Sequence, residues 1–219
     1  MRYRQIIFLL QVEKANFAIA ILLVLLFAPF AKADLDEASR AYLRGDYMDA
    51  LKELAPLAEG GNAEAQFAMG SMYQTGRGVE HDDIKAAMWF GKAAEQGYAE
   101  AQNSLALMYF QGHGVAKNIA KAVGLWRKAA TQGNPAAQNN LGVMYSRGWG
   151  VTKDETLAAR WYRKAASQGY AAAEYKLGVM YLQGGVLARD MNEARKWLHM
   201  AADQGYRPAR DALRTLPPE

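Results

Sequence analysis

A block of 36 residues occurs four times in succession in this chain, beginning at Ala65, Ala101, Ala137 and Ala173. The same columns recur in each block: a leucine or methionine, then a glycine or alanine, then a tyrosine, and a closing Gln-Gly pair. A repeat of this length is typical of stacked supersecondary units, each of which covers the apolar face of its neighbour. The spacing therefore predicts an extended repeat protein and not one closed globule.

The first half of each block has the spacing of an amphipathic helix. In the third copy the apolar or small residues of this stripe are Ala137, Leu141, Gly142, Met144 and Tyr145, which share one helical face. A glycine inside a helix costs about 1 kcal/mol relative to alanine, yet the column of Gly142 holds glycine or alanine in every copy. We infer that a neighbouring helix passes too close there for a larger side chain.

A turn with two glycines follows each first helix. Three copies read Gly-x-Gly-Val, at residues 76–79, 112–115 and 148–151, and the fourth reads Gly184-Gly185-Val186-Leu187. Glycine adopts positive φ without steric penalty, so such turns reverse the chain sharply. The fourth copy departs from the pattern, and its turn geometry is left open.

A second helix is predicted after each turn. Its first residue accepts a hydrogen bond from the free amides of the first turn, a role assigned to Asp82, Asn118, Asp154 and Asp190. Its buried stripe is an alanine, a large residue and another alanine, at Ala86-Phe90-Ala93, Ala122-Trp126-Ala129, Ala158-Tyr162-Ala165 and Ala194-Leu198-Ala201. A glycine then ends each second helix.

The predicted fold is all-α, a right-handed α-solenoid of about five stacked antiparallel helix pairs. Residues 34–64 match the columns of a second helix and form a shortened first pair, residues 65–208 are the four repeats, and residues 209–219 are a capping helix and tail. An antiparallel pair cannot cover its own apolar face, so the pairs must stack.

Residues 1–33 have the features of a signal peptide. Basic residues precede an apolar run at 18–27, and Ala31-Lys32-Ala33 is a small-x-small cleavage signal. Such a signal, cleaved after Ala33, predicts a periplasmic or secreted protein. Removal of the segment would lower the net charge of the chain from +4 to +1, because the segment has four basic residues and one acidic residue. The remaining chain shows no concentrated basic stripe, so nucleic-acid binding is not expected. Retention of the apolar run as a membrane anchor is the alternative.

The pattern Ala-x-x-x-Leu-Gly-x-Met-Tyr, Gly-x-Gly-Val, Asp-x-x-Lys-Ala and Trp-Tyr-x-Lys-Ala-Ala-x-Gln-Gly resembles the Sel1-like repeat family, relatives of the tetratricopeptide repeats. The third block matches it best, and the resemblance covers residues 65–208. It implies a non-enzymatic adaptor that holds a protein or peptide on a concave face lined by the first helix of each pair.

Carried over to this chain, the resemblance places the binding surface on the side of each first helix that faces away from the Leu/Gly/Tyr stripe. Spacing of four and then three residues puts each trio on one helical face. The candidate partner-binding residues are Phe67, Ser71, Gln74, Asn103, Leu107, Phe110, Asn139, Val143, Ser146, Tyr175, Val179 and Leu182. Packing between neighbouring helices is the alternative role for Leu107, Val143 and Val179. Trp149 is expected to fold back on its own loop or to contact a partner.

No catalytic, cofactor-binding or metal-binding residues are expected. The chain has no cysteine, and it contains no Ser-x-x-Lys, Ser-Asp-Asn or Lys-Thr-Gly triplet. Two other functions are left open: an exported hydrolase of the β-lactamase type, which the resemblance suggests because some exported members have been proposed to act on β-lactams, and a membrane-anchored scaffold. The partner and the oligomeric state are not specified by the sequence.

Overall fold

A computed structural model describes residues 35–217, and this part of the chain is helical throughout, without strands. Residues 35–44 form a helix that precedes α2. The helices that follow are α2 (Tyr47–Glu59), α3 (Ala63–Thr75), α4 (Asp83–Glu95), α5 (Ala99–Gln111), α6 (Ile119–Thr131), α7 (Pro135–Arg147), α8 (Glu155–Ala166), α9 (Ala171–Gln183), α10 (Met191–Asp203) and α11 (Arg207–Arg214). The predicted signal peptide lies outside the described residues. None of the helices in 35–217 has the length and apolarity needed to cross a bilayer.

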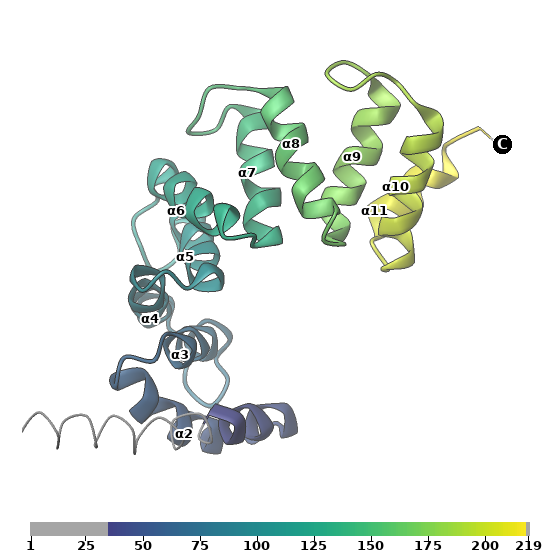
Figure 1. Cartoon of the computed structure of the whole chain (residues 1–219). Coiled ribbons are helices and arrows are strands. Elements are labelled where there is room, and N and C mark those ends of the chain that lie inside the picture. The colour runs from purple at the N-terminus through teal and green to yellow at the C-terminus, as the bar shows by residue number, and fades with distance from the viewer. Residues whose placement is uncertain (1–34, 218–219) are drawn as a thin grey trace, which may run out of the picture.

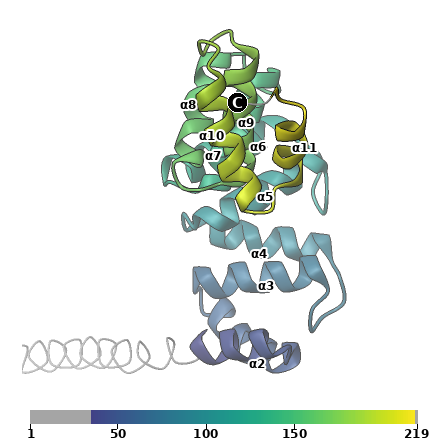
Figure 2. The ribbon, with the colours of Figure 1, turned by 90° about the vertical axis from the view of Figure 1, so that its right-hand side faces the viewer.

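The helices follow one another along an arc (Figure 1), with α3 and α5 on the inner side of α4 and α6. The most extensive packing is within the pairs α3–α4, α5–α6, α7–α8 and α9–α10, and each second helix packs next against the following first helix. Figure 2 shows α3 and α4 side by side. This nearest-neighbour arrangement confirms the predicted α-solenoid.

The predicted stripe of the second helices forms the core. Ala86, Phe90 and Ala93 are fully buried, and so are the equivalent alanines of α6, α8 and α10. Asp82, Asn118 and Asp154 each accept a hydrogen bond from the amide three residues later, and Asp190 accepts two from its first turn. The four second helices therefore begin at the predicted residues.

The small-residue column of the first helices lies against the large residue of the paired second helix. A Cβ added to Gly142 would lie 2.7 Å from Cε1 of Tyr162, and one added to Gly178 would lie 2.7 Å from Cγ of Leu198. At Gly70 the corresponding distance to Phe90 Cδ1 is 2.6 Å. The inferred close approach is thus present, and the ring or leucine of the second helix occupies the space.

The glycine turn of each repeat packs against the second helix of the repeat before it. Both glycines of the first three turns have positive φ. A Cβ on the second glycine, Gly114, would lie 2.0 Å from the Asp83 carbonyl oxygen at the start of α4, and one on Gly150 would lie 2.6 Å from Ile119 Cγ2 at the start of α6. In the fourth turn Gly185 has nothing within 4 Å of such an atom, and Val186 is exposed. Val186 occupies the column of Gly114 and Gly150, so the fourth turn lacks the second glycine of the other three.

A buried glutamine in three repeats ties the helices together. Each donates from Nε2 to a carbonyl of the preceding second helix: Gln66 to Ala58 at 3.0 Å, and Gln102 to Ala94 and Gln138 to Ala130 at 3.2 Å. Its Oε1 accepts a 2.8 Å hydrogen bond from the glutamine that closes its own repeat, Gln96, Gln132 or Gln168. The fourth repeat has Glu174 at this position.

Candidate functional site

The candidate surface, called here the first-helix face, consists of the sides of α3, α5, α7 and α9 that bear the twelve predicted residues. Leu107 is exposed, at 36%, and Asn139 is buried, at 9%. The other ten are half-buried. The face is thus continuous with the packing between helices, and several predicted residues are held in place by neighbours.

Aromatic contacts order both ends of the first-helix face. The Phe67 ring centroid lies 5.6 Å from that of Phe90 and 5.3 Å from that of Tyr98. At the other end the Tyr175 and Tyr206 centroids are 5.5 Å apart. Tyr98 and Tyr206 stand just before α5 and α11, so each tyrosine links the face of one repeat to the start of the next.

Trp149 contacts the face from a turn. Its ring stacks on Phe110 with centroids 5.8 Å apart and an interplanar angle of 30°, and Phe110 also contacts Trp126 at 5.6 Å. Trp149 therefore packs on the preceding repeat and not on its own loop, while 46% of it is exposed. The predicted residue Phe110 therefore has a packing role, and its replacement is expected to lower stability.

Polar groups fix the middle of the face. Asn103 Oδ1 accepts hydrogen bonds from Trp126 Nε1 at 3.1 Å and from Asn140 Nδ2 at 3.2 Å. Asn139 Oδ1 is buried without a protein partner. Burial raises the pKa of Tyr162 to about 12, against the effect of a side-chain hydrogen bond with the predicted residue Ser146. The hydrogen bonds of Asn103 fix the orientation of Trp126 and Asn140 in this part of the face.

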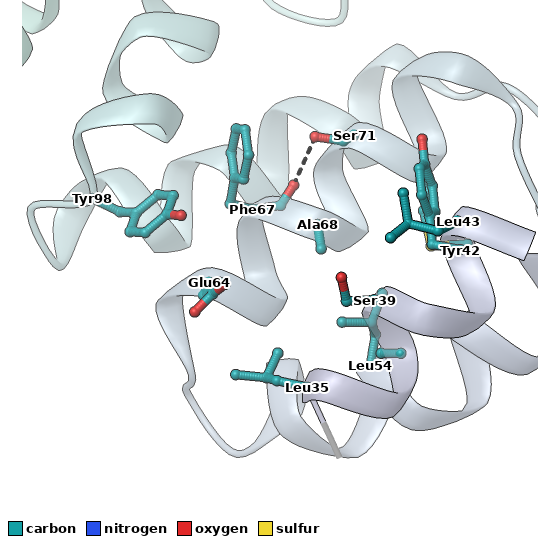
Figure 3. A pocket seen from close by; sticks show the side chains of 12 residues that line it. Leu35, Ser39, Tyr42, Leu43, Leu54, Glu64, Phe67, Ala68, Ser71 and Tyr98 are labelled. Carbon is teal, nitrogen blue, oxygen red and sulfur yellow. Dashed lines mark hydrogen bonds between the residues drawn. The ribbon is translucent and has the colours of Figure 1, made fainter. Parts of the chain in front are cut away.

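A cavity of about 360 Å³ lies at the N-terminal end of the face (Figure 3). The helix at 35–44 contributes Leu35, Ser39, Tyr42 and Leu43 to its lining, α3 contributes Phe67, Ala68 and Ser71, and Tyr98 stands at one side. Leu54 and Met72, which are buried, line it as well. Leu43 is 82% exposed although it lines an apolar cavity.

Charge near this cavity is acidic. Glu64 lines it and is exposed. Burial raises the pKa of Tyr98, and the nearby carboxylates of Glu100 and Glu64 raise it further. The carboxylates of Glu64 and Glu100 thus place negative charge beside the cavity.

The sequence predicts residues 34–64 only as a shortened first helix pair, and the contribution of residues 35–44 to the cavity is an additional finding of the structure. The signal was present in the spacing of Leu35, Ser39 and Leu43, which share one helical face. Of the predicted residues, Phe67 and Ser71 line the cavity. Gln74 also lies on α3 but not in the cavity lining, and the other nine lie on α5, α7 and α9.

The Sel1 repeat family matches the chain at residues 63–98, 99–134, 135–170 and 171–206. These four segments cover more than half of the chain. The chain belongs to the Sel1 repeat family. The matched segments begin two residues before the blocks read from the sequence, so they coincide with the starts of the first helices. Members of this family are in general protein–protein interaction modules.

Solved structures share the fold of this Sel1 repeat chain. An Oxalobacter formigenes Sel1 repeat protein is 35% identical with a TM-score of 0.75, covering 80% of this chain and 71% of that one. The Escherichia coli c5321, a protective antigen of uropathogenic strains, is 34% identical with a TM-score of 0.74, and the match covers 83% of this chain but 40% of that one. The immunity protein Pa5087 from Pseudomonas aeruginosa is 28% identical with a TM-score of 0.58, covering 83% and 68%. No curated protein matches the chain.

Proposed function

We propose that this Sel1 repeat protein is an exported, non-enzymatic adaptor or regulator that binds a peptide or protein segment along the first-helix face. The observation that carries the proposal is the apolar cavity at the start of that face, into which one apolar side chain of the partner would fit. Acidic residues beside the cavity favour a partner with a neighbouring basic residue. Export, to the periplasm or beyond the cell, rests on the features of residues 1–33.

The physical argument for a binding surface is its mixed, weakly charged character. Half-buried aromatic and aliphatic side chains give contact area at low conformational cost, because their neighbours already restrict their rotamers. Amide groups such as Gln74 add hydrogen-bonding capacity at the surface. A similar solenoid serves as an immunity protein in Pseudomonas aeruginosa, and that use accords with a binding role. Neither the hydrolase nor the anchored scaffold gains support from the structure or the comparisons.

Replacing Leu43 and Leu107 together with arginine tests the proposal. Both are exposed, so the fold should tolerate the change, while the added charge and bulk block the cavity and the middle of the face. When the tagged protein is purified from its host, the amount of partner protein recovered with the double variant should be at least about tenfold lower than with the wild type. The melting temperature should be unchanged. The matched control is Val186→Arg, which alters an equally apolar, 48% exposed residue outside the face. Equal loss in the control, or none in the double variant, would contradict the proposal.

A further inference from the structure

A second apolar hollow lies between the second helices α4 and α6, apart from the first-helix face. It encloses about 600 Å³, and α5 supplies Leu105 and Tyr109 to its lining. Ile84 and Met88 of α4 line it and are 71% and 47% exposed. Large apolar side chains that are this exposed beside a hollow mark a candidate interaction surface. We call it the α4–α6 groove.

Two glycines keep the groove open. Gly91 of α4 and Gly124 of α6 line it, and a Cβ built on either would have no heavy atom within 4 Å. Each costs its helix about 1 kcal/mol relative to alanine, and unlike Gly70 or Gly142 neither is required by a neighbouring side chain. Packing within the described chain therefore does not explain them.

The other repeats fill the same positions with long, mostly charged side chains. The column of Gly91 holds Arg127, Arg163 and His199, and the column of Gly124 holds Met88, Arg160 and Lys196. The repeat itself therefore accommodates large residues there. The groove between α4 and α6 is a local departure from the pattern, and it exposes backbone and apolar surface that later repeats cover with charge.

Positive charge borders the groove on the α6 side. Lys121 and Lys128 line it, are exposed, and form no ion pair within residues 35–217. They are seven residues apart, about two helical turns or roughly 10.5 Å along the axis. Lys121 Nζ lies 5.1 Å from the Tyr109 ring centroid, and Glu95 is the one carboxylate that lines the groove.

We propose that the α4–α6 groove binds an amphipathic helix of a partner protein, whose apolar stripe is flanked by carboxylates spaced by two turns. A helix laid between two helices packs its ridges into their groove, and glycine at the contact allows its backbone to approach closely. Ile84 and Met88 would cover the apolar stripe, and Lys121 and Lys128 would pair with the carboxylates. This surface would work alongside the first-helix face and does not depend on it.

A designed helical peptide tests the proposal. The probe is a fluorescent peptide of about 18 residues with a leucine and alanine stripe flanked by glutamates at i and i+7, and the matched probe carries lysines in place of the glutamates. Fluorescence anisotropy measures the affinity of each for the purified protein. The wild type should bind the acidic peptide at least about tenfold more tightly than the basic one.

Two variants and one control complete the experiment. Gly91→Gln with Gly124→Gln fills the groove with long neutral side chains, and it should weaken binding of the acidic peptide at least about tenfold without lowering the melting temperature, because glutamine favours helix more than glycine. Lys121→Glu with Lys128→Glu should reverse the preference between the peptides. Leu43→Arg, at the cavity beside the first-helix face, should leave both affinities unchanged. Equal binding of the two peptides by the wild type, or unchanged binding by the glycine variant, would overturn the proposal.

Discussion

At the scale of single residues, Glu174 breaks a regular series of hydrogen bonds. Its Oε2 accepts from Gln204 Nε2 at 2.8 Å, as the glutamine oxygens do in the earlier repeats. Its Oε1 stands in place of the glutamine nitrogen that donates to the preceding second helix, and this oxygen is buried without a partner. The whole residue is 0% exposed. Burial raises the pKa of Glu174, while the hydrogen bond from Gln204 lowers it.

Glu174→Gln should therefore stabilise the protein and remove a pH dependence. A carboxyl whose pKa is raised by folding contributes fully to stability below its unfolded value of 4.5, and this contribution is lost as pH rises through the higher folded value. The wild type should thus lose stability above pH 4.5 relative to the variant. At neutral pH the variant should be more stable by about 1–3 kcal/mol, because a buried unsatisfied group is replaced by a hydrogen-bonded amide.

Urea unfolding of both proteins from acid to neutral pH measures this difference. Glu174→Ala serves as a control, since it removes the carboxyl without restoring the hydrogen bond. Parallel stability curves for wild type and the glutamine variant would show that Glu174 does not carry the effect.

At the scale of helices, the geometry within each pair is set by one small residue opposite one large one. The sequence predicted this column correctly, because glycine inside a helix is costly and its recurrence demands a packing reason. The sequence could not name the partner. Gly142 lies against Tyr162, and Gly178 lies against Leu198. These contacts join residues twenty positions apart, and they depend on how the second helix crosses the first.

Gly142→Leu should lower the free energy of unfolding by roughly 1–3 kcal/mol through overpacking against Tyr162. Gly124→Leu is the matched control, since it also places leucine inside a helix but in open space. The control should retain or gain stability because leucine favours helix over glycine. Chemical denaturation followed by circular dichroism measures both. Equal effects of the two substitutions would show that the close approach does not govern pair geometry.

At the scale of the whole molecule, the period of 36 residues was enough to predict the solenoid, the glycine turns and the residues at which the second helices begin. Two features of the surface could not be predicted from this period. The N-terminal cavity forms where residues 35–44 meet α3 and Tyr98, and its hollow depends on side-chain placement that periodicity does not specify. The α4–α6 groove arises where residues depart from the repeat, so the shared pattern hides it. The twelve residues of the first-helix face stay a prediction as a binding set.

Site-specific photocrosslinking in living cells is the most direct measurement of which face of the solenoid binds a partner protein. A photoreactive amino acid at Leu107 lies on the first-helix face, and one at Arg160 lies exposed on the second helix α8. We expect a discrete protein adduct from position 107 that is lost when Leu43 is also replaced by arginine, and no such adduct from position 160. The same adduct from both positions, or an adduct from position 160 alone, would contradict this expectation.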